Sequence, residues 1–263
     1  MPVDYRSQTT LITGASSGLG ALFARRLAAR GSDLILVARR TDRLEALAAE
    51  LPSVRVTTIG MDLSEPGAGA KLAAAVAERG LTVTSLINNA GFGTHGMFHE
   101  ADPRRITEEI TLNVTSLTEI SRAFIEPLRA YGKGVLINVA SIIAYQPGPT
   151  LAVYAATKAY VLSLTEALYA ESRGTGLRVM ALSPGPTETE FFQVAGEHAD
   201  GGMPRSSPER VVDEAIRALD RRNPPPSLIT GRSLRIAIGT GRLAGRRVTL
   251  ALLGRMMGQT VRR

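Results

Sequence analysis

The chain has 263 residues, of which 44% are hydrophobic, and its 26 glycines, with no tryptophan and no cysteine, are typical of a single α/β domain. The lack of cysteine excludes disulfides, thiolate nucleophiles and zinc–thiolate sites. No apolar run approaches ~18 residues and the N-terminus lacks the apolar stretch of a signal peptide, so we expect a cytoplasmic protein that does not span a membrane.

The chain has a net charge of +7, and its excess of basic residues lies in the C-terminal segment. Residues 231–263 contain eight arginines and no acidic residue, whereas residues 1–230 contain 23 basic and 24 acidic residues. A nucleic-acid-binding domain would carry a basic patch of its own. We therefore expect no nucleic-acid partner.

The first predicted strand, residues 9–13, leads into a glycine-rich turn and then a helical pattern over residues 21–30. Such glycines let the backbone approach a pyrophosphate, and the helix N-terminus offers N–H groups and the positive end of its dipole. The spacing is G-x-x-x-G-x-G rather than G-x-G-x-x-G, and glycine-rich turns are common, so this motif alone is a weak signal. The candidate cofactor-binding residues here are Gly14, Ser16, Ser17, Gly18, Leu19 and Gly20.

The second predicted strand, residues 33–38, bears on the choice of dinucleotide. A carboxylate at its end would indicate a ribose with a free 2′-hydroxyl. Ala38 stands there instead, followed by Arg39 and Arg40. Two guanidinium groups favour a 2′-phosphate and hence NADP(H). The alternative is that both arginines are solvated at the start of a helix predicted over residues 41–51.

Strands and helices alternate along the rest of the chain. Further strands are predicted over residues 54–59, 85–87, 134–139, 177–182 and 227–230, and helices over residues 67–79, 103–131 (one helix or two) and 211–219. This alternation predicts a parallel sheet with helices on both faces.

Tyr154 and Lys158 are four residues apart in a helical stretch, so their side chains lie on one face about a turn apart. Moving a tyrosine pKa from ~10 to ~7 requires roughly 4 kcal/mol, and an ammonium ~4 Å away at an effective dielectric of ~20 supplies about that much. Ser141 follows the strand over residues 134–139, where its hydroxyl is well placed to hold a carbonyl oxygen. The alternative is a chance pair on a helix, but only three of the 31 basic residues are lysines, which favours a functional reason for Lys158.

Several motifs occur together and in order, namely TGASSGLG, NNAG, Asn113, Ser141, Tyr154-x-x-x-Lys158 and Pro184-Gly185. With this combination the chain, from about Thr9 to Gly231, resembles the short-chain dehydrogenase/reductase family. The resemblance implies a Rossmann-type doubly wound parallel sheet of seven strands in the order 3-2-1-4-5-6-7, in a catalytic domain of residues 1–231. It also implies a homo-oligomer, either a dimer or a tetramer.

The resemblance further implies a catalytic tetrad of Asn113, Ser141, Tyr154 and Lys158. Tyr154 would be the general acid in reduction and the base in oxidation, Ser141 would hold the carbonyl oxygen, and Lys158 would lower the tyrosine pKa and bind the nicotinamide ribose. Asn113 would hold a water that links Lys158 to solvent, unless it is a plain core or kink residue. Asp62 would meet the adenine amino group and Thr187 the nicotinamide carboxamide, and Asn88 would brace strands. The remaining cofactor-binding residues would be Leu63, Asn89, Ala90, Gly91, Pro184 and Gly185.

Residues 187–204 correspond to the segment that closes over substrate in this family. Its large apolar side chains are Phe191 and Phe192, and Phe92, Ile142 and Ile143 would form the other walls. This lining favours a largely apolar carbonyl compound or alcohol. The three histidines, His95, His99 and His198, are scattered, so we expect no metal site.

The C-terminal extension, residues 232–263, continues beyond the point where family members often end. Val248, Leu252 and Met256 recur every four residues, with Leu253 and Met257 beside them, which predicts a short helix with an apolar face flanked by arginines. We expect it to pack on its own domain or on a neighbouring subunit. The alternative is weak contact with an anionic membrane surface.

These observations together predict an oxidoreductase that transfers a hydride between NADP(H) and a carbonyl or secondary alcohol of a largely apolar small molecule. A catalytically idle dinucleotide-binding sensor or scaffold would explain the glycines and the fold but not the intact tetrad. A membrane-peripheral reductase of lipid-soluble carbonyls would differ only in the extension.

Overall fold

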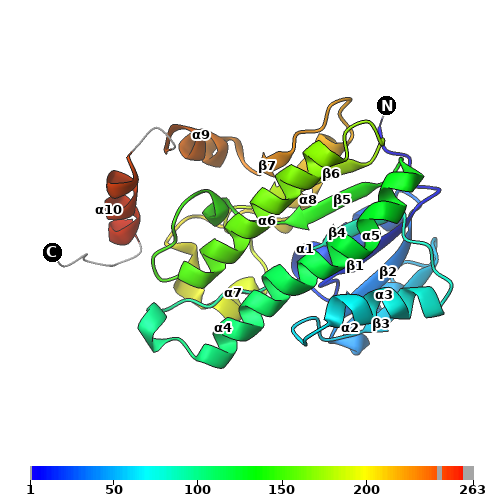
Figure 1. The fold of residues 1–263 in the computed structure, drawn as a ribbon, viewed down its shortest axis with the longest axis horizontal. Helices are drawn as coiled ribbons and strands as arrows, with labels where there is room; N and C mark the ends of the chain where they lie inside the picture. The colour runs from blue at the N-terminus through cyan, green and yellow to red at the C-terminus, as the bar shows by residue number, and fades with distance from the viewer. Residues whose placement is uncertain (1, 242–244, 257–263) are drawn as a thin grey trace.

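Seven parallel strands form one sheet at the centre of the computed structural model, which describes residues 2–241 and 245–256 (Figure 1). Their order is β3-β2-β1-β4-β5-β6-β7. This is the strand order that the family resemblance implies, so the predicted order is confirmed. The strands are β1 (Thr9–Thr13), β2 (Asp33–Ala38), β3 (Val56–Gly60), β4 (Ser85–Asn88), β5 (Val135–Val139), β6 (Arg178–Ser183) and β7 (Ser227–Ile229).

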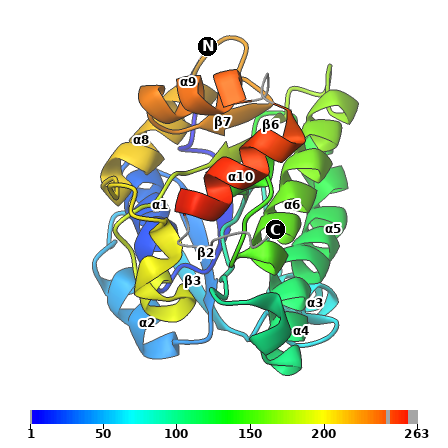
Figure 2. The ribbon, with the colours of Figure 1, turned by 90° about the vertical axis from the view of Figure 1, so that its left-hand side faces the viewer.

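Helices cover both faces of the sheet, as Figure 2 shows. One face packs against α1 (Gly18–Ala28), α2 (Thr41–Ala49) and α8 (Pro208–Leu219), and the other against α3 (Ala68–Glu78), α5 (Leu117–Tyr131) and α6 (Ala152–Glu171). The central strands are therefore buried on both sides, which is why β5 (VLINV) is a continuous apolar run apart from one asparagine. Its five residues are all buried.

The stretch from residue 103 to residue 131 forms two helices joined by a π-helical turn. Helix α4 (Pro103–Ile110) begins at Asp102, whose carboxylate accepts a hydrogen bond from the Arg104 backbone N–H at 2.9 Å. The π turn η2 (Thr111–Ser116) carries the buried Asn113 and leads directly into α5. Of the two arrangements expected, one helix or two, the structure has two. The interruption falls at the predicted site residue.

The remaining elements are short or lie near the C-terminus. They are η1 (Phe98–Glu100), η3 (Ile142–Tyr145), α7 (Phe191–Ala195), η4 (Glu197–Asp200), α9 (Arg232–Gly241) and α10 (Arg246–Met256). The helix predicted in the extension corresponds to α10, whereas α9 was not foreseen. No helix in the described parts of the chain is long and apolar enough to cross a membrane.

Helix α10 stands in front of the end of the sheet at which the strands terminate (Figure 2). Val248 and Leu250 are 55% and 41% exposed, and Leu253 is half-buried. Of the predicted stripe, the structure therefore describes two side chains, an exposed Val248 and a half-buried Leu253. Met257 and the side chains of Leu252 and Met256 lie outside the described residues.

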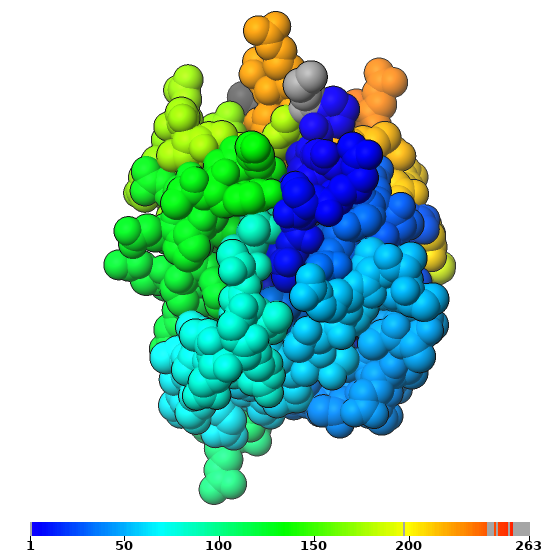
Figure 3. Space-filling view, turned by 90° about the vertical axis from the view of Figure 1, so that its right-hand side faces the viewer, coloured from blue at the N-terminus to red at the C-terminus, as the bar shows by residue number. Residues whose placement is uncertain are grey.

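The opposite end of the molecule carries the N-terminal segment, which is dark blue in Figure 3. The Val3 backbone N–H donates to the Asp220 carboxylate at 3.1 Å, and the Gln8 side chain donates to the Lys133 carbonyl oxygen at 3.1 Å. The N-terminal segment is therefore attached away from the loops that form the pocket.

Candidate active site

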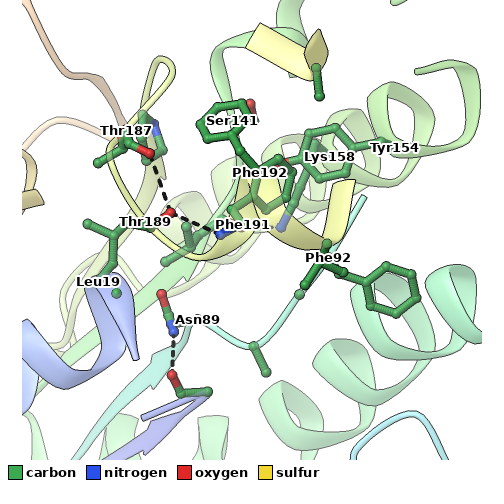
Figure 4. Close-up of a pocket in the computed structure, with 18 of the residues that line it drawn as sticks. Leu19, Asn89, Phe92, Ser141, Tyr154, Lys158, Thr187, Thr189, Phe191 and Phe192 are labelled. Carbon is green, nitrogen blue, oxygen red and sulfur yellow. Dashed lines mark hydrogen bonds between the residues drawn. The ribbon is translucent and has the colours of Figure 1, made fainter. Parts of the chain in front are cut away.

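The loops at the carboxyl ends of the strands enclose one pocket, which is where ligands bind in open α/β sheets (Figure 4). All five residues predicted for the substrate walls line it. So do all residues predicted for the cofactor except Gly20, and all members of the predicted tetrad except Asn113. Predicted residues that are up to 178 positions apart in the sequence, Gly14 and Phe192, thus meet in one place.

The glycine-rich turn has the backbone that its sequence requires. Gly14 and Gly18 have φ angles of 66° and 52°, in the left-handed region that favours glycine. A Cβ on Gly20 would collide with the Gly14 carbonyl oxygen and would lie 2.7 Å from the Asn89 amide nitrogen. Gly20 therefore permits close packing of α1 behind the turn, which explains why it does not line the pocket.

Asn89 ties the NNAG loop to the glycine-rich turn. Its side-chain N–H groups donate to the carbonyl oxygens of Thr13 and Gly14 at 3.0 and 3.2 Å, and its backbone N–H donates to the Thr13 hydroxyl at 3.0 Å. Figure 4 shows one of the side-chain hydrogen bonds of Asn89. The preceding Asn88 donates to Ser121 on α5 and to Asn138 on β5. The expectation that Asn88 braces neighbouring elements is confirmed.

The two predicted arginines have different surroundings. Arg39 is 71% exposed and pairs with the Asp62 carboxylate at 3.5 Å. Arg40 instead donates to the hydroxyls of Ser16 and Ser17, and it forms an ion pair with Glu190 at 2.8 Å. Arg40 is therefore part of the wall that holds the glycine-rich turn, whereas Arg39 lines the pocket and is largely exposed to solvent.

Glu190 links this wall to the segment that follows β6, and no sequence pattern indicated this role. It pairs with Arg43 at 2.5 Å as well as with Arg40. Hydrogen bonds from Arg43 and Arg40 lower the pKa of Glu190. The result is a bridge of three charged groups between α2 and the start of α7.

Asp62 and Thr187, both assigned to the cofactor by resemblance, make local hydrogen bonds. Burial acts to raise the pKa of Asp62, but hydrogen bonds from Ser64 and the nearby Arg39 outweigh it, so that pKa is lowered. The Thr187 hydroxyl donates to the Gly185 carbonyl oxygen at 2.9 Å. Thr189, which we did not predict, also lines the pocket and lies beside Gly18.

Tyr154 and Lys158 lie on α6, and Ser141 follows β5 (Figure 4). The Ser141 hydroxyl accepts the Ile143 backbone N–H at 3.3 Å and so caps η3. The Lys158 ammonium lies 5.7 Å from the centroid of the Tyr154 ring and is buried, with 3% of the residue exposed. One face of α6 and the end of β5 thus bring the three functional groups together.

Burial dominates the ionisation of both helix residues. It raises the pKa of Tyr154, while hydrogen bonding with Ser141 acts in the opposite direction. Burial also lowers the pKa of Lys158 to about 8. The structure therefore lacks the lowered tyrosine pKa that we expected, because removing the phenol from water outweighs the groups around it.

Asn113 lies behind the pocket, and its side chain is fully used within the protein. Its oxygen accepts the Phe92 backbone N–H at 3.2 Å, while its N–H groups donate to the Phe92 carbonyl oxygen at 2.8 Å and to the Thr157 hydroxyl at 3.1 Å. Asn113 therefore fixes the loop after β4 against α6. Its role in holding a water stays a prediction.

The predicted substrate walls are apolar and carry two arginines that the sequence did not reveal. The rings of Tyr154 and Phe191 lie 5.3 Å apart, and Phe192 stands edge-on to Phe191. Arg105 and Arg205 each stack 3.9 Å from an aromatic centroid, over Phe92 and Phe192 respectively. Leu253 of α10 completes the lining on the side of the C-terminal extension.

The chain is similar in sequence to a known family and to individual known proteins. Residues 8–200 match the family model of the short chain dehydrogenases. A sulfoacetaldehyde reductase of Chromohalobacter salexigens is 39% identical over 186 residues, covering 70% of this chain and 74% of that protein. A very-long-chain 3-oxoacyl-CoA reductase-like protein of Arabidopsis thaliana is 33% identical over 217 residues, covering 80% and 69%.

A solved structure gives the same result for nearly the whole chain. It is a short-chain dehydrogenase from Sphingobium yanoikuyae in complex with NADPH, with a TM-score of 0.79, 37% identity, and coverage of 93% of this chain and 95% of that one. With its fold, its glycine-rich turn and its serine, tyrosine and lysine in one pocket, this chain belongs to the short-chain dehydrogenase/reductase family of oxidoreductases, which bind NAD(P) and act on alcohols or carbonyl compounds.

Proposed function

We propose that this enzyme is an NADP(H)-dependent reductase or dehydrogenase of largely apolar carbonyl compounds and secondary alcohols. The observation that carries the proposal is the meeting of Ser141, Tyr154 and Lys158 in a pocket that also contains the glycine-rich turn. A catalytically idle dinucleotide sensor would not need these three groups together.

Each residue has a task that its position supports. When bound, the nicotinamide supplies or accepts the hydride. The Ser141 hydroxyl holds the carbonyl oxygen, and the Tyr154 hydroxyl donates its proton to that oxygen in reduction and takes it back in oxidation. Lys158 provides a positive charge beside Tyr154, and this charge stabilises the phenolate that forms when Tyr154 has given up its proton.

The preference for NADP(H) rests on charge at the end of β2. Ala38 replaces the carboxylate that would accept a ribose 2′-hydroxyl, and Arg39 is exposed beside it. Arg40 and Arg43 add positive charge on the same side, although Glu190 pairs with both. The NADPH complex of the Sphingobium yanoikuyae relative supports the same choice.

The apolar substrate class rests on the aromatic walls. Phe92, Phe191 and Phe192 line the same pocket as Ser141, together with Ile142 and Ile143. A panel of aldehydes, ketones and alcohols, with NADPH or NADP⁺ and detection of reduced nicotinamide, tests the proposal. Cofactor binding without turnover on any member of the panel would favour the idle sensor.

The organisation around this activity is a catalytic domain of residues 1–231 and an extension of residues 232–263. Leu234 of α9 packs near Gly185, so the extension begins against a pocket loop. We expect a cytoplasmic homo-oligomer, a dimer or a tetramer, in which the extension packs on the protein. The exposed Val248 and Leu250 keep weak binding to an anionic membrane as the alternative.

A further inference from the structure

Helix α4 carries a carboxyl group that has no part in the site as described so far. Glu109 has no exposed surface, and neither of its carboxylate oxygens makes a hydrogen bond with any residue in the described ranges. An unpaired carboxylate inside a protein is costly. A buried polar group that makes no hydrogen bond therefore requires a specific explanation.

The position of Glu109 connects it with the candidate active site. It lies in the last turn of α4, four residues before Asn113, and α4 packs against α6, the helix of Tyr154 and Lys158. The hydroxyl and backbone N–H of Thr94, in the loop after β4, lie near enough to favour its charged form. A π turn follows it directly, and such turns are frequent at functional sites.

The charged and titratable groups that face Glu109 come from two helices. Helix α6 contributes Lys158 and Tyr154, and α4 itself contributes Arg105, while the π turn has no titratable side chain. The pKa of Glu109 is raised, because burial outweighs the lowering effects of Thr94, Arg105 and Lys158. In return, the charge of Glu109 acts to raise the pKa of both Lys158 and Tyr154.

We infer that Glu109 is a positioning residue for hydride transfer, a buried carboxylate that keeps Lys158 an ammonium ion beside Tyr154. A buried lysine loses its proton more readily than a solvated one, and a negative charge in the same low-dielectric region opposes that loss. The inference rests on the proposed function, since it takes Tyr154 and Lys158 as the catalytic pair. It adds a fifth group, outside the tetrad, that sets the pH range of that pair.

The pH dependence of kcat/KM in Glu109→Gln tests this role. Removing the charge lowers the pKa of both Lys158 and Tyr154, so the alkaline limb of reduction and the acid limb of oxidation both move to lower pH. We expect a shift of about one pH unit, the usual size for a nearby buried charge. Glu109→Asp, which keeps the charge, is expected to show midpoints close to those of the wild type.

Glu108→Gln is the matched control for this experiment. It makes the same chemical change one residue away, at a side chain that is 52% exposed and pairs with Arg105 at 3.6 Å. Because exposed charges are screened, its pH midpoints should stay at the wild-type values. Equal midpoints in wild type, Glu108→Gln and Glu109→Gln would overturn the inference.

A second experiment needs no turnover and therefore separates this inference from the proposed function. The melting temperature is measured for Glu109→Leu in the wild-type chain and in the Lys158→Met background. If the two charges stabilise each other, leucine raises the melting temperature more when Lys158 is absent, because Glu109 has then lost its counter-ion. Additive effects of the two substitutions would overturn the inference even if the enzyme proved active.

Discussion

The Lys158 ammonium donates a hydrogen bond to the Val139 carbonyl oxygen, 2.8 Å away. Val139 is the last residue of β5, so the sheet itself orients the lysine toward the end of the strand that precedes Ser141. The hydrogen bond satisfies one of the three ammonium protons, and burial of the remainder lowers the pKa of Lys158 to about 8. Both facts have consequences that are measurable.

Replacing this lysine should change how stability depends on pH. An unfolded lysine has a pKa of about 10.4, so between pH 8 and that value the unfolded chain binds more protons than the folded one, and wild-type stability rises with pH. The melting temperature of Lys158→Met relative to wild type should therefore be highest below pH 8 and fall as the pH rises further. Lys133→Met, at an exposed position, is the control. The same pH dependence in both variants would contradict the prediction.

Tyr154→Phe should reduce turnover by several orders of magnitude and leave cofactor affinity nearly unchanged. The substitution removes only the hydroxyl group that carries the transferable proton, while the ring keeps its contact with Phe191. Steady-state kinetics and cofactor titration measure the two quantities separately. A variant that keeps more than about a tenth of the wild-type rate would remove Tyr154 from the proposed mechanism.

Arg39→Ala should weaken binding of NADPH far more than binding of NADH. Arg39 is exposed beside the end of β2, and loss of one charge-assisted contact to a phosphate is worth roughly 1.5 to 3 kcal/mol. Dissociation constants for both cofactors provide the measurement. Equal losses for the two would mean that Arg39 does not contact the 2′-phosphate.

Arg40→Ala is the informative comparison for that variant. Arg40 holds the Ser16 and Ser17 hydroxyls of the glycine-rich turn, and it also pairs with Glu190. Its removal should weaken both cofactors, because the turn that would bind the pyrophosphate loses a support. If Arg40→Ala instead affects NADPH alone, then Arg40 contacts the 2′-phosphate directly.

Truncation after Gly231 should lower the melting temperature or change the oligomeric state. It removes Leu234, which packs near Gly185, and Leu253, which lines the pocket. Truncation after Gly245 removes α10 but keeps α9, and so separates the two contributions. An unchanged melting temperature and oligomeric state, together with loss of salt-sensitive binding to anionic vesicles, would show that the extension is a membrane contact instead.

The strands and the glycine-rich turn were predictable from local patterns, whereas the strand order and most of the pocket residues were expected from the family resemblance. The apolar run of β5 predicts a buried strand, and the glycines before α1 permit the positive φ angles of the turn. Glu190 and Glu109 were not predictable, since a charged residue in a helical stretch is normally solvated, and only the folded chain shows that one pairs with Arg40 and the other is buried. The prediction of a lowered pKa for Tyr154 was wrong for a related reason. Spacing in the sequence gives the nearness of Lys158 but not the degree of burial, which dominates.

The π turn at Thr111–Ser116 also limits which changes in chain length the enzyme can tolerate. A π turn holds more residues than an α turn, so it amounts to an inserted residue in an otherwise continuous α-helix. Deleting one residue from this turn would allow α4 and α5 to join as a regular helix. Everything on the N-terminal side would then rotate by about 100° relative to α5. Helix content would be preserved, but Glu109 would turn away from Lys158. A shortening that improves the helix would therefore separate the two charges.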